Sequence, residues 1–130
     1  MDRGVTDDER LTILLAEDDE QIRRLFADVL RRDGYQVIVA ESGDDALIKV
    51  AEHEGPLHLL LTDLMMPLLR GDKLAQHIRE LHPSVKIVYV SGYGTTARLQ
   101  GGELDTGAAL VQKPVTPEKL LAIVKDTLAS

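Results

Sequence analysis

The sequence contains no cysteine among its 130 residues and has no long apolar run. Without cysteine there are no disulfides, thiolate nucleophiles or cysteine-based zinc sites, and the composition agrees with a reducing compartment. Apolar runs such as residues 57–61 are far too short to cross a bilayer, and residues 1–10 lack the apolar stretch of a secretion signal. We therefore expect a cytoplasmic protein that makes no membrane contact.

Positive charge is also scarce in this chain. Lysine and arginine together number 15 against 22 aspartates and glutamates, so the formal net charge is −7. Because a protein that neutralises phosphates needs a basic face, we expect no direct nucleic-acid binding. A content of 44% hydrophobic and 28% charged residues is typical of a globular protein. We predict a flexible leader over residues 1–10 and one domain over 11–130.

Short apolar runs recur along the chain, and amphipathic segments separate them. Runs of this kind are typical of strands that are buried on both faces of a sheet. The predicted strands cover residues 11–16, 36–40, 57–62, 85–90 and 108–111.

The segments between the strands carry apolar residues at the spacing of amphipathic helices. The first has its apolar stripe at Ile22, Leu25, Phe26, Val29 and Leu30, and Gly34 follows its end. Further predicted helices cover residues 44–53 after the N-cap Ser42, 72–81, part of 93–105, and the segment after the N-cap Thr116. Gly101 and Gly102 increase the backbone entropy that is lost when the fourth helix forms, so we expect this helix to be short or mobile.

Five apolar strands that alternate with helices predict an α/β fold with a parallel sheet covered on both faces, since right-handed crossovers connect such strands. The fold is therefore doubly wound. In these sheets polar chemistry collects at the carboxyl ends of the strands, near the point where the strand order reverses.

Polar residues follow four of the predicted strands. Glu17 and Asp18 follow the first, Asp63 the third, Ser91 the fourth and Lys113 the fifth. Three carboxylates at adjacent strand ends repel one another, which raises their pKa values unless a cation compensates the charge. Mg²⁺ prefers oxygen ligands and is often held by one or two carboxylates and a phosphate oxygen. The pattern predicts a magnesium site.

The same strand ends supply what phosphoryl transfer requires. A lysine and a hydroxyl, Lys113 and Ser91, are suited to stabilise charge on the oxygens of a phosphoryl group. Asp63 lies centrally among these positions and is the best nucleophile, because carboxylates form covalent phosphoryl intermediates in other proteins.

Four motifs occur in one order: Leu-Leu-Ala-Glu-Asp-Asp-Glu at 14–20, Leu-Leu-Thr-Asp-Leu-Met-Met-Pro at 60–67, Ser91-Gly92, and Lys113-Pro114. With them the chain resembles a response-regulator receiver domain of two-component signalling over residues 11–128. Each motif alone is weak evidence for this resemblance, whereas all four in the family's order are specific to the family. The resemblance implies a flavodoxin-like, five-stranded parallel sheet of order 2-1-3-4-5 with five flanking helices.

The resemblance also implies a role for each motif residue. Asp63 is the phosphoacceptor, and Ser91 and Lys113 contact the phosphoryl oxygens. The implied ligands of Mg²⁺, or of Mn²⁺ in its place, are Glu17 through water, Asp18, Asp63 and the backbone carbonyl of Met65. The bond between Lys113 and Pro114 is expected to be cis, an isomer that is inexpensive only before proline.

Two departures from the family pattern affect the expected signal. Leu110 stands where the family often has an aromatic residue that turns inward on phosphorylation, so the aromatic switch is absent. Met65 and Tyr93 occupy positions that line the path of a hydrolysing water, and neither is suited to hold that water. We therefore predict slow self-dephosphorylation.

The leading hypothesis is a signalling domain that takes a phosphoryl group from a sensor histidine kinase or a phosphotransfer domain and catalyses its own phosphorylation and dephosphorylation. It is expected as a monomer or weak dimer, either as a stand-alone regulator or as a piece of a hybrid kinase, with an unknown downstream partner. The alternative is a phosphorylation-independent interaction module of the same fold, which Leu110 and the glycines of the fourth helix favour. An aspartyl-phosphate phosphatase would need an acid at Met65, and a nucleotide-binding protein would need a glycine-rich loop after the first strand.

Simpler interpretations exist for individual residues. The acidic run at 17–20 also suits the N-terminus of a helix, and the metal pair could be Asp18 and Asp19 in another register. His53 and His58 share no helical face, so a surface role is favoured over a metal site. The apolar residues at 65–69 either pack around their loop or form a patch that docks a partner.

Overall fold

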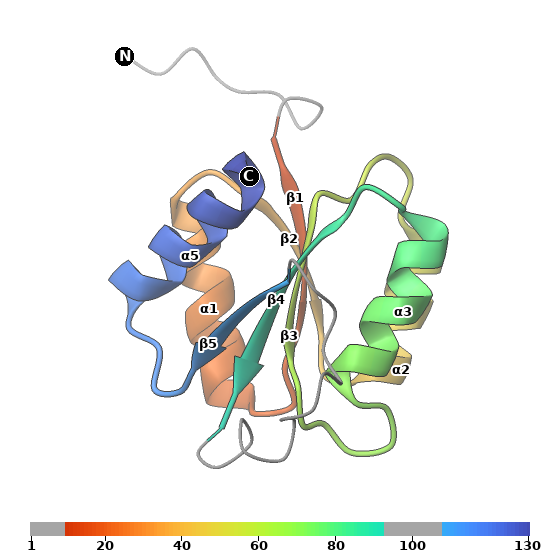
Figure 1. Cartoon of the computed structure of the whole chain (residues 1–130), viewed down its shortest axis with the longest axis horizontal. Coiled ribbons are helices and arrows are strands. Elements are labelled where there is room, and N and C mark those ends of the chain that lie inside the picture. The colour runs from red at the N-terminus through yellow and green to blue at the C-terminus, as the bar shows by residue number, and fades with distance from the viewer. Residues whose placement is uncertain (1–9, 93–107) are drawn as a thin grey trace.

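The computed structural model describes residues 10–92 and 108–130, shown as coloured ribbon in Figure 1. The predictions for the leader, for Tyr93 and for the fourth helix with Gly101 and Gly102 lie outside these residues.

The described part of the chain forms one five-stranded parallel sheet (Figure 1). Its strands are β1 (Thr12–Ala16), β2 (Gln36–Ala40), β3 (Leu59–Asp63), β4 (Lys86–Ser91) and β5 (Ala109–Gln112). The spatial order is β2-β1-β3-β4-β5, and every neighbouring pair is parallel. This confirms the predicted doubly wound fold and its strand order.

Helices cover both faces of the sheet (Figure 1). They are α1 (Glu20–Arg32), α2 (Gly43–Glu52), α3 (Gly71–Leu81) and α5 (Pro117–Ala129). Helices α1 and α5 lie on one face, and α2 and α3 lie on the other. Residues 10–92 and 108–130 thus contain four of the five predicted helices.

The central strands are buried on both sides because each face has its own helical cover. All five residues of β1 and of β3 are buried. Along β1, Leu14 packs toward α2 and α3, while Ile13 and Leu15 pack toward α1 and α5. This alternation follows from the two-residue period of a strand, and burial on both faces explains the near absence of polar residues before each strand end.

Two of the four described helices begin at the predicted N-caps. Ser42 Oγ accepts the Asp45 amide at 3.0 Å, and Thr116 Oγ1 accepts the Lys119 amide at 3.1 Å. One prediction for α1 is wrong, because Leu25 is 45% exposed. The helix buries Phe26, Ala27 and Leu30, and at 100° per residue Leu25 lies beside that contact stripe instead of within it.

Strand β2 is an edge of the sheet, and cationic side chains occupy two of its carbonyls. Arg31 Nη2 donates to the Val37 carbonyl at 3.0 Å, and Lys49 Nζ donates to the Val39 carbonyl at 2.7 Å. Free edge carbonyls can pair with a strand of another molecule. The two cations protect the edge at these positions.

Candidate functional site

The carboxyl ends of the parallel strands meet at the lower end of the sheet in Figure 1. Glu17 directly follows β1, while Asp63 and Ser91 are the last residues of β3 and β4. Lys113 directly follows β5, and its amide donates to the Ser91 carbonyl at 2.8 Å. The strand order reverses between β1 and β3, so these residues lie at the switch point of the fold.

Three carboxylates lie together at this position. Oxygen atoms of Glu17, Asp18 and Asp63 all lie within 4.8 Å of one another. Glu17 is only 1% exposed and Asp63 is also buried, while Asp18 faces solvent. The described residues contain no other group of three or more histidines and acids with this geometry. The structure therefore brings together the three carboxylates that the sequence pattern selected.

Lys113 balances part of this negative charge. Its Nζ lies 3.0 Å from Asp63 Oδ2 and 3.3 Å from Glu17 Oε1. One ammonium faces three carboxylates, so the cluster keeps an excess of negative charge and has the chemical character of a divalent-cation site.

The acidic run at 17–20 divides into two functions. Asp19 Oδ1 accepts the Ile22 amide at 3.0 Å and caps α1, and Glu20 forms an ion pair with Arg24 on the helix surface. Glu17 and Asp18 instead belong to the carboxylate cluster. The N-terminal interpretation thus applies to the second half of the run, while Glu17 and Asp18 lie with Asp63 in the cluster.

Burial changes the electrostatics of Glu17. Desolvation is the main reason that its pKa rises from 4.5 to about 7, and the negative charge of Asp63 adds to the effect. The Asp19 amide, which donates to Glu17 Oε2 at 3.0 Å, and the charge of Lys113 act in the opposite direction. Glu17 Oε1 is buried, and its contact within the described part of the chain is the ion pair with Lys113.

The electrostatics of Lys113 favour its charged form. Burial by itself lowers the pKa of Lys113, but the hydrogen bond to Asp63 and the charges of Glu17 and Asp63 raise it overall. The ammonium is therefore held charged next to the carboxylate that the sequence identifies as the nucleophile.

The loop after β3 holds Asp63 closely. The Met65 amide donates to Asp63 Oδ1 at 3.2 Å, and the Gly71 amide donates to the Leu64 carbonyl at 2.9 Å. A Cβ at Gly71 would press against the Asp63 carbonyl oxygen and lie 3.0 Å from Leu64 Cα. The family resemblance marks Gly71 as the glycine of the loop after the acceptor, but its close approach to the Asp63 backbone was not predicted.

Ser91 is fully buried at the end of β4. Its Oγ forms no hydrogen bond with any residue at 10–92 or 108–130. A buried hydroxyl normally finds a partner, so an unpaired one beside this cluster suits a group that a ligand engages.

The remaining positions named in the sequence analysis are Met65, Tyr93, Leu110 and Pro114. The peptide bond between Lys113 and Pro114 is cis, as the family resemblance implies. The side chains of Met65 and Leu110 are exposed. Tyr93 lies outside the described residues.

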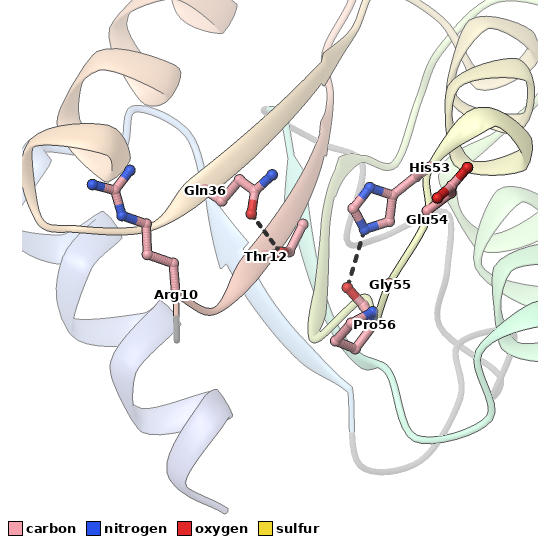
Figure 2. Close-up of a pocket in the computed structure, with 7 residues that line it drawn as sticks. All are labelled: Arg10, Thr12, Gln36, His53, Glu54, Gly55 and Pro56. Atoms are coloured by element: carbon pink, nitrogen blue, oxygen red, sulfur yellow. Dashed lines mark hydrogen bonds between the residues drawn. The ribbon is translucent and has the colours of Figure 1, made fainter. Parts of the chain in front are cut away.

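The two histidines lie at the opposite end of the sheet and are used separately. His58 Nδ1 accepts the Thr12 amide at 2.9 Å. Figure 2 shows His53 in a pocket where its Nε2 lies 3.2 Å from the Pro56 carbonyl oxygen, while Thr12 Oγ1 lies 3.4 Å from Gln36 Oε1. His53 thus contacts its own turn, while His58 joins the segment before β3 to the start of β1, and neither belongs to a group of three or more metal-binding side chains among the described residues.

Two arginines near the site make contacts that the sequence did not predict. Arg23 Nη1 donates to the Glu17 carbonyl at 2.9 Å and fixes the turn between β1 and α1. Arg70 binds the Asp72 carboxylate through two hydrogen bonds of 3.0 and 3.2 Å. Neither contact has a sequence signal, because each depends on how a long side chain folds back.

The fold and the site define a doubly wound α/β domain with a carboxylate and lysine cluster at its switch point. The model of the response regulator receiver domain family matches residues 13–125, and the chain belongs to this family. Its function class is therefore that of receiver domains of two-component signalling, in which a phosphoacceptor role is implied by the family.

Individual relatives agree with this assignment. The chain is 35% identical over 102 residues to the response regulator receiver protein CpdR of Brucella abortus. The aligned region covers 78% of this chain and 83% of CpdR. The chain is 32% identical over 117 residues to the sensor kinase CckA of the same organism, covering 90% of this chain but only 12% of CckA. A crystal structure of the receiver domain of the hybrid histidine kinase CckA matches with a TM-score of 0.76 at 32% identity, over 90% of this chain and 98% of that one. No helix in the described residues is long and apolar enough to span a membrane.

Proposed function

We propose that this chain accepts a phosphoryl group on Asp63 from the phosphohistidine of a sensor kinase or phosphotransfer protein, in a reaction that requires Mg²⁺ or Mn²⁺. The observation that supports this best is the position of Asp63, whose two carboxylate oxygens contact the Lys113 ammonium and the Met65 amide. Donors on both oxygens hold the carboxylate in one orientation, which is how positioning assists phosphoryl transfer.

The residues present fit a divalent cation. The buried Glu17 Oε1 shares the Lys113 ammonium with Asp63, at 3.3 Å and 3.0 Å, so three carboxylates exceed the charge of one lysine. Asp18, Asp63, the carbonyl of Met65 and, through water, Glu17 would hold the ion, as the family resemblance implies. When bound, the ion would neutralise charge on the phosphoryl oxygens.

The proposed transfer involves one bond broken and one formed. The phosphorus–nitrogen bond of the donor breaks, and its electron pair returns to the imidazole nitrogen, which takes up a proton. A phosphorus–oxygen bond forms to one carboxylate oxygen of Asp63. Lys113 would then leave its ion pair with that carboxylate and, with Ser91, contact the transferred oxygens, where added negative charge attracts both donors.

The direct test is the mass of the intact protein after treatment with acetyl phosphate, with and without Mg²⁺. The wild type is expected to gain one phosphoryl group only with Mg²⁺, and Asp63→Asn is expected to gain none. Asp19→Asn is the matched control, because asparagine retains the cap of α1. A wild type without Mg²⁺-dependent gain would contradict the proposal and favour the phosphorylation-independent interaction module. Gain by Asp63→Asn would contradict the assignment of the acceptor.

A second expectation concerns the lifetime of the phosphorylated state. The exposed Met65 side chain offers no amide or carboxylate to orient a water molecule near Asp63. We expect slow self-dephosphorylation, and Met65→Asn is expected to raise the hydrolysis rate about tenfold, less than a general base contributes, because an asparagine amide would orient the water but not take its proton. Loss of the phosphoryl group is followed by mass spectrometry after the donor is removed. An unchanged rate in the variant would count against this expectation.

The wider setting of the domain is also proposed from its relatives. The match to nearly all of CpdR suits a stand-alone regulator, and the match to a small part of CckA suits a piece of a hybrid kinase. A cytoplasmic location, a monomer or weak dimer, and the lack of nucleic-acid binding remain predictions from the sequence.

A further inference from the structure

Leu68 has an unusual backbone and an unusual exposure. Its φ is 71°, in the left-handed region that disfavours a leucine, and its side chain is 96% exposed. The Leu69 amide donates to the Pro67 carbonyl at 2.7 Å, so Leu68 is the central residue of a γ-turn. Glycine or asparagine would adopt this turn more easily and would not expose an apolar side chain.

The residues on both sides of Leu68 explain why the turn is fixed. Met66 is buried in the core between the sheet and helices α2 and α3, and Leu69 packs against that core. The Leu69 side chain fills the space beside Gly43, so that a Cβ at Gly43 would lie 2.8 Å from the Leu69 Cβ. The loop is therefore anchored before and after Leu68, and these anchors direct Leu68 into solvent.

The loop between β3 and α3 lies next to Asp63, and this position limits which molecules can contact Leu68. It begins at Asp63, and the amide of Met65 binds the Asp63 carboxylate at 3.2 Å. A protein that delivers a phosphoryl group from a histidine must bring the histidine to bonding distance of Asp63. Its surface must then approach the loop that carries Leu68. A small phosphodonor reaches the carboxylate without covering the loop.

We propose that Leu68 is an apolar contact for the protein that donates the phosphoryl group, and that it packs against an apolar surface next to that protein's phosphohistidine. The inference rests on the proposed function of Asp63. The inference gives a role to a leucine that is exposed and does not pack in the interior of the domain. Backbone strain of this kind is concentrated at functional sites. Burial in the complex would recover the apolar contact that the free domain lacks.

The test compares two phosphodonors on the same variants. The protein donor is the autophosphorylated sensor kinase that transfers fastest to the wild-type chain, chosen from the kinases of the source organism. The small donor is acetyl phosphate. Leu68→Asn keeps a residue suited to the turn and removes the apolar side chain, while Leu68→Met keeps an apolar one. Leu81→Asn is the control, because Leu81 is 57% exposed at the far end of α3.

For the protein donor, Leu68→Asn is expected to lower kcat/KM about tenfold, mostly through KM, with Leu68→Met and Leu81→Asn close to wild type. With acetyl phosphate all four proteins are expected to react equally. Because asparagine tolerates the left-handed region, the melting temperature of Leu68→Asn is not expected to fall.

Three results would overturn the inference. The first is an unchanged kcat/KM for transfer from the kinase to Leu68→Asn. The second is an equal loss of rate with acetyl phosphate, which would mean that Leu68 affects the position of Asp63 and not the binding of a partner. The third is a wild type that reacts with acetyl phosphate but with no kinase. Failure of the wild type with acetyl phosphate is a different result, because it removes the proposed function itself and the inference with it.

Discussion

Gly71→Ala is expected to lower the free energy of unfolding by about 3 kcal/mol or more, the largest stability effect that we predict. A Cβ at this position presses against the carbonyl oxygen of Asp63 and lies 3.0 Å from the Leu64 Cα. These are backbone atoms of β3 and of the residue that follows it, so they cannot rotate away as a side chain can. Either α3 or the end of β3 must move, and the second movement displaces Asp63.

Chemical denaturation of both proteins measures this difference. Gly43→Ala is the comparison variant, because its Cβ would lie 2.8 Å from the Cβ of Leu69, so that the loop carrying Leu69 must move but no strand backbone is displaced. We expect a smaller loss for the control, about 1 kcal/mol. If Gly71→Ala retains wild-type stability, or loses no more than Gly43→Ala, the close approach of α3 to the acceptor is not the constraint inferred here.

Without divalent cations, the wild-type protein is expected to lose stability as the pH rises from about 5 to about 8. The pKa of Glu17 is raised from 4.5 to about 7 in the folded state, chiefly by burial. Between these values the native state binds more protons than the unfolded state, so the free energy of unfolding falls with rising pH. The full shift corresponds to a loss on the order of 3 kcal/mol above pH 7.

Glu17→Gln tests the source of this dependence. The variant cannot ionise at this position, so its stability is expected to change less between pH 5 and 8 and to exceed that of the wild type at pH 8. Denaturant melts at several pH values provide the comparison, and Glu20→Gln, which alters an exposed ion pair with Arg24, is the control. Equal pH dependence in wild type and Glu17→Gln would contradict the assignment.

Mg²⁺ is expected to reverse the loss at high pH. An ion that binds only the folded state stabilises it by mass action, and it favours the ionised form of Glu17. We therefore expect Mg²⁺ to raise the stability of the wild type at pH 8 more than that of Glu17→Gln. The same gain in both proteins would place the ion away from Glu17.

Much of the fold followed from patterns that depend on neighbouring residues. The strands begin within two residues and end within one residue of the predicted positions, because burial on both faces requires apolar runs that stop where the sheet stops. Ser42 and Thr116 were identified as caps because a cap is a local contact between a side chain and a nearby amide. The strand order came from the family resemblance, and no local pattern specifies it.

Other features of the site could not be predicted from local patterns. The exposure of Leu25 depends on the angle at which α1 packs on the sheet. The division of labour within the acidic run depends on where α1 begins, since Asp19 caps the helix while Glu17 turns toward Lys113. The left-handed turn at Leu68 depends on the anchors at Met66 and Leu69 and has no signal in a leucine.

The sequence by itself determined which polar residues meet at one edge of the sheet in this receiver domain, because parallel strands place their carboxyl ends at one edge and the polar residues follow those strands. Only the tertiary structure decided how these residues interact. Lys113 bridges Asp63 and Glu17 across strands that are separated by up to 96 residues of chain, Glu17 becomes a buried carboxylate of raised pKa, and Leu68 is held in solvent. These properties arise from distances and burial between separate elements, which no local spacing of residues encodes.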